Sequence, residues 1–257
     1  MDFTSLFGDS MADSFRENAR QILDYLERTR KLQRDLAPDT LPQNLQEYAA
    51  TPEARALLYE VLFDDGIPLA FALSSETVGA VVDAPNRAAR IERLWSRRKG
   101  ILSRCAEGLD SVTAAHLGHS VELARQALEA YQHGLHGPAQ AQAMAIVDTH
   151  YTSHAPQSTA NAVKHARPME HLQGKVDNRA FPVHAPIARA YARKYLGSPT
   201  QGREAEDPPR ELSRHATIHG THPNQYTKRN ALQALVMVTS LLRLLQDEHR
   251  RAAFTRP

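Results

Sequence analysis

Residues 214–220, Arg-His-Ala-Thr-Ile-His-Gly, combine the side chains of this chain that are best suited to chemistry on a phosphate group. Arg214 and His219 are separated by four residues, and His215 directly follows the arginine. A guanidinium group holds phosphate oxygens by a planar two-point contact. An imidazole takes up and releases a proton near neutral pH, so it can serve as a general acid or base. These residue types at this spacing therefore indicate phosphodiester chemistry.

The segment is expected to form a short helix, because residues that favour helix ends lie on both sides of it. Pro208 and Pro209 come before it, and Ser213 or Glu211 is placed to begin it. Gly220 follows directly and fits the position after the last helical residue, where glycine adopts a left-handed conformation most easily. The motif is thus predicted on a short helix that is bounded at both ends.

Helix geometry restricts how the side chains of this motif can meet. At about 100° per residue, two side chains five positions apart point roughly 140° away from each other. Arg214 and His219 therefore converge only if the arginine stem bends round or if both side chains flank a cleft. His215 and His219 are four positions apart and share one face of the helix. A site built on this motif must therefore lie in a cleft or at an interface.

The rest of the chain shows helical spacing of its apolar residues and predicts an all-α protein. Residues 118–133 and 139–151 flank a Gly-Leu-His-Gly-Pro break and are predicted to form a helical hairpin. Residues 227–251 are apolar around most of the helix circumference, so this helix is expected to be buried on several sides. The other expected helices are 13–36, one that opens at 51–53, 76–83, 85–109, a short one near 160–166, and 185–196.

Three segments between these helices have a different composition. Asp64-Asp65-Gly66 is typical of a turn, and residues 201–209 are polar, acidic and end in proline, as in a mobile loop. Residues 67–73 are apolar but have no clear period. They fit a strand and the start of a buried helix equally well.

The composition is that of a soluble globular protein. Apolar residues make up 42% of the 257 positions, charged residues make up 23%, and the formal net charge is +2, so neither disorder nor a strongly basic nucleic-acid-binding surface is indicated. The single cysteine cannot form an internal disulfide, which favours a reducing compartment. The first residues lack the pattern of a signal peptide, and no uncharged apolar run reaches the ~18–20 residues of a membrane span. We therefore expect a cytoplasmic protein without a membrane partner.

The motif and the helices around it resemble the HEPN domain superfamily. The signature of that family is an arginine, a polar residue, three further positions and a histidine, which Arg214, His215 and His219 match. Residues 226–235 are similar to the start of the last helix in one bacterial group of these proteins, and residues 122–151 are similar to the first two core helices of that group. The resemblance covers about the second half of the chain.

This resemblance implies a HEPN-like helical bundle over residues 106–257, preceded by an N-terminal helical region over residues 1–105. Many members of the family are homodimers in which two copies of the motif face each other. Many act as metal-independent endoribonucleases in toxin–antitoxin, abortive-infection or antiviral defence systems. The implied partners are RNA, a second copy of the chain, and an antitoxin or defence-system protein; no metal or other cofactor is implied. The implied reaction is attack by the ribose 2′-hydroxyl on the adjacent phosphate.

The resemblance also implies a role for each residue of the site. His219 would act as general base or acid, Arg214 would stabilise the charge of the phosphorane, and His215 would help to position the phosphate or a water molecule. Asp148, on the second helix of the hairpin, could orient the arginine. Asp148 and Thr217 are expected to position the substrate, and the alternative is that Asp148 is solvated or locally bonded.

Several alternatives remain open on the sequence. Some HEPN-like proteins are inactive and bind a nucleotide, a nucleic acid or a protein. The arginine and histidine could instead cap helix carbonyls or bond to an acidic side chain such as Glu211. His215, His219 and His222 include the i, i+4 spacing of zinc ligands, but they lack the glutamate of the His-Glu-x-x-His pattern. Finally, the N-terminal helices could carry the function of a structural interaction protein.

Overall fold

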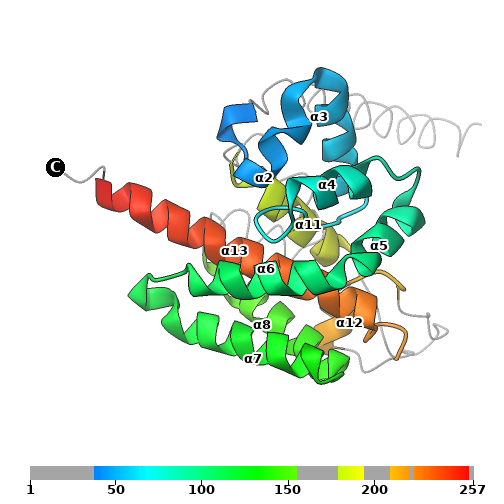
Figure 1. Cartoon of the computed structure of the whole chain (residues 1–257). Helices are drawn as coiled ribbons and strands as arrows, with labels where there is room; N and C mark the ends of the chain where they lie inside the picture. The colour runs from blue at the N-terminus through cyan, green and yellow to red at the C-terminus, as the bar shows by residue number, and fades with distance from the viewer. Residues whose placement is uncertain (1–37, 155–178, 194–208, 220–222, 255–257) are drawn as a thin grey trace, which may run out of the picture.

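The computed structural model describes residues 38–154, 179–193, 209–219 and 223–254, and helices are the only regular structure in these ranges (Figure 1). The predicted all-α class is therefore confirmed. The short helices are η1 (Pro38–Thr40), η2 (Tyr48–Ala50), the π-helical η3 (Glu60–Asp64) and η4 (Ala115–Leu117). The α-helices are α2 (Gln43–Gln46), α3 (Pro52–Tyr59), α4 (Ser75–Val82), α5 (Arg87–Ser96), α6 (Arg98–Asp110), α7 (Gly118–Gln132), α8 (His136–His154), α11 (Phe181–Ala192), α12 (Arg214–His219) and α13 (Lys228–Phe254).

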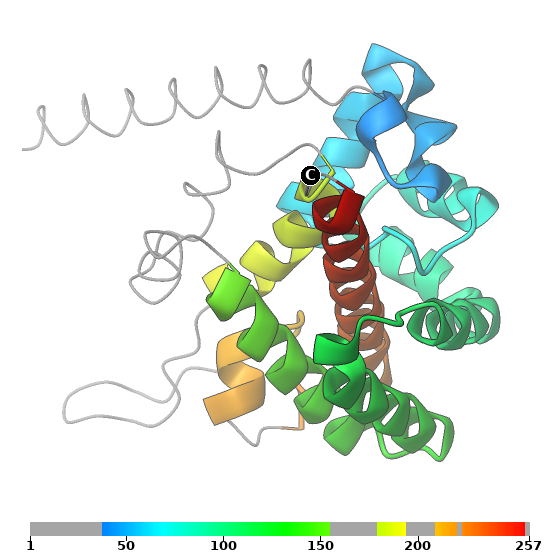
Figure 2. The same cartoon turned by 90° about the vertical axis from the view of Figure 1, so that its left-hand side faces the viewer.

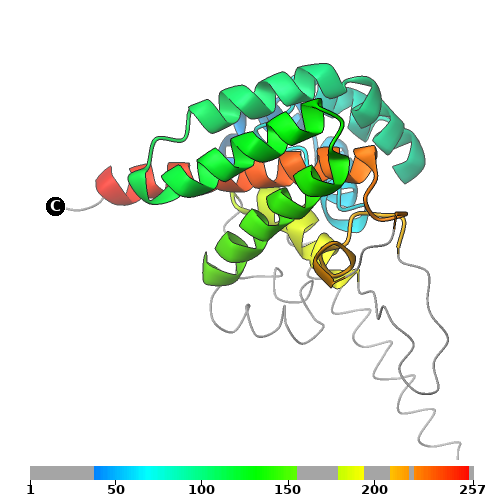
Figure 3. The same cartoon turned by 90° about the horizontal axis from the view of Figure 1, so that it is seen from below.

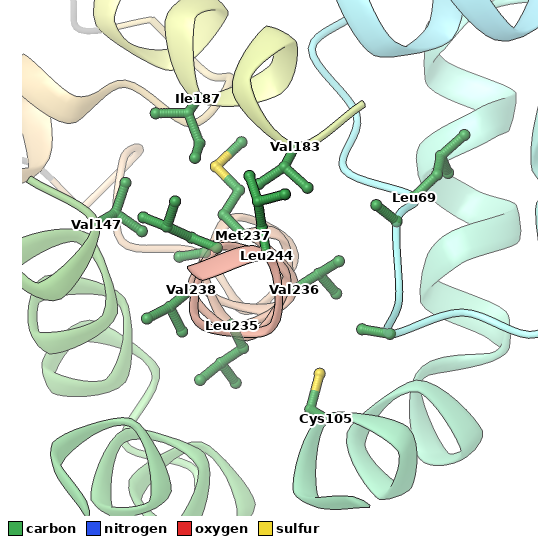
Figure 4. Packing of buried hydrophobic residues seen from close by; sticks show 14 of the residues in the cluster. Leu69, Cys105, Val147, Val183, Ile187, Leu235, Val236, Met237, Val238 and Leu244 are labelled. Carbon is green, nitrogen blue, oxygen red and sulfur yellow. The ribbon is translucent and has the colours of Figure 1, made fainter. Parts of the chain in front are cut away.

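The longest of these helices, α13, lies at the centre of the fold. Figure 2 shows it running down the middle of the fold, with other helices on both sides of it. Residues 230–242 are all buried, and α6, α7, α8 and α11 pack against the helix. Figure 4 shows that Leu235, Val236, Met237 and Val238 point in different directions from the helix axis. The burial on several sides that the sequence predicts is confirmed.

Buried polar side chains on α13 hold it in position by hydrogen bonds to connecting segments. Gln246 accepts hydrogen bonds from the backbone N–H groups of Thr113 and Ala114, at 2.7 and 2.8 Å. Ser240 donates to the carbonyl oxygen of Ala70 at 2.6 Å. A buried polar group that loses its hydrogen-bond partner costs about 1–3 kcal/mol. These bonds therefore favour one position of α13 over positions that are shifted along its axis.

Helices α7 and α8 form the predicted hairpin, and both pack against α13 (Figure 3). Gly134 lies in the turn between them with a φ of +80°, a conformation that glycine adopts without strain. Helix α8 begins at His136, a few residues earlier than the sequence indicates. The hairpin matters for the motif because α8 carries Asp148 to α11 and α12.

The single long helix predicted over residues 85–109 is wrong, because the chain forms two helices that break at Arg97. Arg97 has a φ of −98° and a ψ of 8°, and its N–H bonds to the carbonyl oxygen of Leu94 in a tight last turn. No proline or glycine marks this position in the sequence. Tertiary packing decides it, since α6 lies along α13 whereas α5 packs against α4.

Other expected segments differ from the structure in smaller ways. Residues 67–73 form neither a strand nor a helix, but a buried irregular stretch between η3 and α4. At the predicted turn, Asp64 ends η3 and Gly66 has a φ of +66°. Helix α11 begins at Phe181, before the expected residue 185. The motif itself forms the short helix that its flanking residues predict.

The described residues form one hydrophobic core. The boundary expected at residue 105 falls inside α6, and the core includes residues from both sides of it. Within the described ranges, no helix combines the length and the apolar character that a membrane crossing requires. The helices expected at 13–36 and near 160–166 lie outside the described residues, as do residues 201–208 of the expected loop.

Truncation of a side chain on the central helix should be costly. Leu235 is 1% exposed, so Leu235→Ala should lower the free energy of unfolding by about 2–5 kcal/mol through the cavity that it leaves. Leu57→Ala makes the same chemical change on α3, where the side chain is 40% exposed, and should cost less than about 1 kcal/mol. Chemical denaturation followed by circular dichroism measures both values. Similar losses in the two variants would contradict the central burial of α13.

The only cysteine of the chain offers a probe of the same core. Cys105 is fully buried on α6, as a small core residue, and burial raises the pKa of its thiol to about 12. The thiolate is the reactive form, so an aromatic disulfide reagent at pH 8 should not modify the native protein. It should modify one thiol per chain in denaturant, which absorbance measures directly. Rapid modification in native buffer would show that the contact between α6 and α13 opens easily.

Candidate functional site

Arg214 and Asp148 form a two-point ion pair between α12 and α8. The Nε and Nη2 atoms of the arginine each donate to a different carboxylate oxygen, both at 3.0 Å. The arginine side chain is 25% exposed and the aspartate side chain 27%. The sequence allowed Asp148 to orient the arginine or to be solvated or locally bonded, and the structure places its carboxylate on the guanidinium of Arg214.

Tyr191 of α11 is the third member of this cluster. Its hydroxyl donates to Oδ1 of Asp148 at 2.5 Å. The guanidinium carbon of Arg214 lies 5.4 Å from the centre of the tyrosine ring, within the range of a cation–π contact. Asp148, Tyr191 and Arg214 thus join three helices, and we call them the Arg214 cluster.

The electrostatics of the cluster fix the protonation state of two of its members. Burial, followed by the hydrogen bond to Asp148 and the charge of that carboxylate, raises the pKa of Tyr191 well above its ordinary value. Burial acts to lower the pKa of Arg214, but the hydrogen bonds to Asp148 and its charge outweigh this effect, and the pKa is raised. At neutral pH the phenol is therefore protonated and the guanidinium is charged.

Ser213 begins the motif helix and ties it to the end of α11. Its hydroxyl accepts a hydrogen bond from the N–H of Ala216 at 3.2 Å, which is the usual contact of a serine N-cap. The same hydroxyl donates to the carbonyl oxygen of Arg193. Arg193 in turn donates to the carbonyl oxygen of Leu212 at 3.1 Å. Of the two starting residues that the sequence offers, Ser213 is the one that makes the cap.

Gln225 holds the segment before the motif from the other side. This side chain is fully buried. Its oxygen accepts a hydrogen bond from the N–H of Ser213 at 2.8 Å. Its nitrogen donates to the carbonyl oxygens of Pro209 and Glu211, at 2.8 and 3.0 Å. One amide side chain therefore satisfies three backbone groups and fixes where α12 begins.

Thr217 points into the protein, away from solvent. It is 3% exposed, and its hydroxyl accepts a hydrogen bond from Gln140 of α8 at 2.8 Å. The carbonyl oxygen of Thr217 accepts a hydrogen bond from the hydroxyl of Tyr226 at 2.5 Å. The described geometry thus gives Thr217 a place in the packing of α12 against α8, and its expected contact with a substrate stays a prediction.

The two histidines of the motif lie on the same short helix as Arg214. His215 is half-buried, next to the arginine in sequence. His219 is the last residue of α12, and its side chain lies outside the described part of the chain. The convergence of Arg214 and His219 therefore stays a prediction. Glu211, offered as an acidic partner for the arginine, lies instead 3.8 Å from Arg87.

The zinc alternative gains no support in the described residues. No three histidine, cysteine, aspartate or glutamate side chains come together there in a way that could hold a metal ion. His222, the third member of the histidine set, lies outside the described ranges.

The cluster can act on an anion through the remaining donors of Arg214. The contact with Asp148 uses one edge of the guanidinium, whereas a guanidinium has five N–H donors. The group is held in one orientation, and part of its side chain is exposed. Asp148 also neutralises its charge, so a phosphate would gain less Coulomb attraction here than at an unpaired arginine.

Three residues of this site do not emerge from sequence reasoning. Tyr191 contacts Asp148, Gln140 contacts Thr217 and Gln225 contacts Ser213, and no local spacing in the sequence connects these pairs. Their only signal in the sequence is a glutamine or tyrosine within an otherwise apolar helical region, since such a polar group requires a hydrogen-bond partner when it is buried.

Removal of the Asp148 charge should loosen the cluster. Asp148→Asn replaces one carboxylate oxygen by an N–H donor that faces Arg214, and we expect a loss of about 1–2 kcal/mol in the free energy of unfolding. Asp110→Asn breaks the pair with Arg125, whose side chains are 68% and 45% exposed, and should cost less than about 0.5 kcal/mol. Urea denaturation compares the two. An equal, small effect would show that the Arg214 pair has no structural role.

Comparison of the chain with protein-family models, curated proteins and solved structures finds no match. The site therefore has to be judged on its own residues and geometry.

Proposed function

We propose that this chain is a metal-independent endoribonuclease of a toxin, abortive-infection or related defence system, acting in the cytoplasm. One observation carries the proposal. Arg214 is held in a fixed orientation by Asp148 and Tyr191, is 25% exposed, and lies on a short helix with two histidines. A fixed guanidinium beside imidazole groups is suited to stabilise charge and move protons at a phosphodiester.

The proposed reaction uses the 2′-hydroxyl of RNA as its nucleophile. His219 takes the proton of that hydroxyl while the oxygen forms a bond to the adjacent phosphorus. The bond from phosphorus to the 5′-oxygen breaks, and that oxygen receives a proton from an imidazolium. Arg214 stabilises the extra negative charge of the phosphorane, and His215 positions the phosphate. The products are a 2′,3′-cyclic phosphate and a 5′-hydroxyl end.

The proposal includes a homodimer in which two copies of the motif face each other. On an ideal helix, Arg214 and His219 point roughly 140° apart, so one copy of the motif does not bring both side chains to the same phosphate. In the dimer, the motif of the second copy supplies the other side chain. Such a dimer also provides two histidines, one for each proton transfer. An antitoxin or another defence-system protein would act by covering this interface.

The second candidate is a HEPN-like module that binds a nucleotide, nucleic acid or protein without cutting it. The neutralisation of Arg214 by Asp148 favours this alternative, because it weakens the electrostatic stabilisation that catalysis requires. The burial of Thr217 favours it as well, since one more residue of the motif then serves the packing of α12.

The proposal predicts cleavage of single-stranded RNA in the presence of a chelator. The wild type should yield 2′,3′-cyclic phosphate ends, and Arg214→Ala and His219→Ala should each lower the rate by about 10²–10³-fold. His133→Ala, an exposed histidine in the turn after α7, is the matched control and should retain full activity. Gel analysis of end-labelled RNA with chemical identification of the ends measures all four proteins.

The result also separates the two candidates. RNA that is bound but not cut, with binding lost in Arg214→Ala, would replace the nuclease by the binding module. Cleavage that persists in His219→Ala, or that requires a divalent metal, would contradict the proposed mechanism.

A further inference from the structure

A polar cavity lies between α2, the irregular stretch 67–73 and the C-terminal half of α13. Its volume is about 560 Å³, within the range of ~300–1,000 Å³ that is usual for small-molecule sites. Figure 1 shows these elements, with α2 above α13 and α6 along its length. None of the residues that line it belongs to the Arg214 cluster.

Four arginines from three separate parts of the chain line this cavity. Arg104 lies on α6, Arg179 precedes α11, and Arg243 and Arg251 lie on α13. Among the described residues, the carboxylates that line it are Glu47 and Asp247, so arginines outnumber carboxylates there. Like charges that gather in one place repel each other, and an anion that binds between them removes this cost.

On α13, the charged residues of the cavity follow a regular spacing. Arg243, Asp247 and Arg251 are four positions apart, so they lie on one face of the helix. This face borders the cavity, which Thr40 and Asn44 also line. The last turns of α13 thus extend beyond the core and present two guanidinium groups to the cavity.

Two of the arginines differ in how they are held. Arg243 donates to the hydroxyl of Ser111, and its guanidinium carbon lies 5.7 Å from the ring centre of Phe71. Arg104 is exposed and makes no hydrogen bond or ion pair with any residue in the described part of the chain. Arg243 is therefore held in position before a ligand binds, whereas Arg104 keeps all its N–H donors for a ligand.

A strained turn forms one wall of the same cavity. Phe71 has a φ of +60°, and the N–H of Ala72 bonds to the carbonyl oxygen of Ala70 at 2.6 Å, which makes a γ-turn of the rare, strained form. The turn is held by Asn44, which accepts from the N–H of Phe71 at 3.1 Å and donates to the carbonyl oxygen of Leu69 at 2.9 Å. Strain of about 1–3 kcal/mol at a single residue is found mainly at functional sites.

We propose that this cavity binds a small molecule with two or more phosphate groups, such as a nucleoside diphosphate or triphosphate. The arginines supply planar two-point contacts for phosphate oxygens. The hydroxyl of Ser75, which also lines the cavity, supplies a neutral donor for the rest of the molecule. The inference is independent of the nuclease proposal, because it uses no residue of the Arg214 cluster.

The test is a direct binding measurement with defined probes. Isothermal titration calorimetry of the full chain, at low salt and with a chelator, compares ATP, inorganic tripolyphosphate and adenosine. ATP should bind and adenosine should not. Tripolyphosphate that binds as tightly as ATP assigns the site to an inorganic polyphosphate, and weaker binding assigns it to a nucleotide. If neither phosphate compound binds below about 1 mM, or if adenosine binds as well as ATP, the proposal is wrong.

Charge reversals show whether binding occurs in this cavity. Arg104→Glu and Arg251→Glu should each weaken binding by about tenfold or more, since each removes a charged hydrogen-bond donor. Arg250→Glu is the matched control: Arg250 is the neighbouring exposed arginine on α13, and it does not line the cavity. An equal loss in Arg250→Glu would show that only overall charge is measured. Far-ultraviolet circular dichroism of each variant confirms that α13 is intact.

Discussion

The burial of residues 230–242 of α13 on every side is the constraint on which the rest of this fold depends. A helix with apolar residues around its circumference has no face that can remain in water, so other helices must cover it in each direction. Helices α6, α7, α8 and α11 do so. The break at Arg97 follows from this requirement, since it allows α6 to lie along the central helix while α5 packs mainly against α4. The position of α12 follows as well, because the motif helix packs against both α8 and α11.

The sequence predicts those features that depend on local spacing, and it misses those that depend on contacts between distant segments. The periods of α7, α8 and α13 were sufficient to predict these helices, because each buries an apolar face. The break at Arg97 carries no proline or glycine, so nothing local marks it. The motif was visible as a set of residue types, and Asp148 could be named as a partner from the hairpin. Tyr191 could not, since its contact with Asp148 joins residues 43 positions apart.

A comparison of two arginines shows what distinguishes the candidate site from structural ion pairs. Arg90 donates to Glu60 and Asp65, both at 2.7 Å, and its side chain is only 4% exposed. Arg214 makes a two-point contact with a single carboxylate at 3.0 Å, and a quarter of its side chain is exposed (25%). The ion pairs of Arg90 connect α3 and η3 to α5. The ion pair of Arg214 holds a charged group in a fixed orientation where another molecule can still reach it.

A hydrogen bond of 2.8 Å between the N–H of Ser213 and the side chain of Gln225 joins the residues that lie before and after the motif. A second hydrogen bond, from the side chain of Asn230 to the carbonyl oxygen of Arg210 at 3.1 Å, joins two residues that lie just outside the first pair in sequence. The two ends of this segment are therefore joined by hydrogen bonds that use no side chain of the motif. The side chains of Arg214, His215 and His219 can therefore differ without the loss of these two bonds, whereas Thr217 is fixed by its place in the packing of α12 against α8.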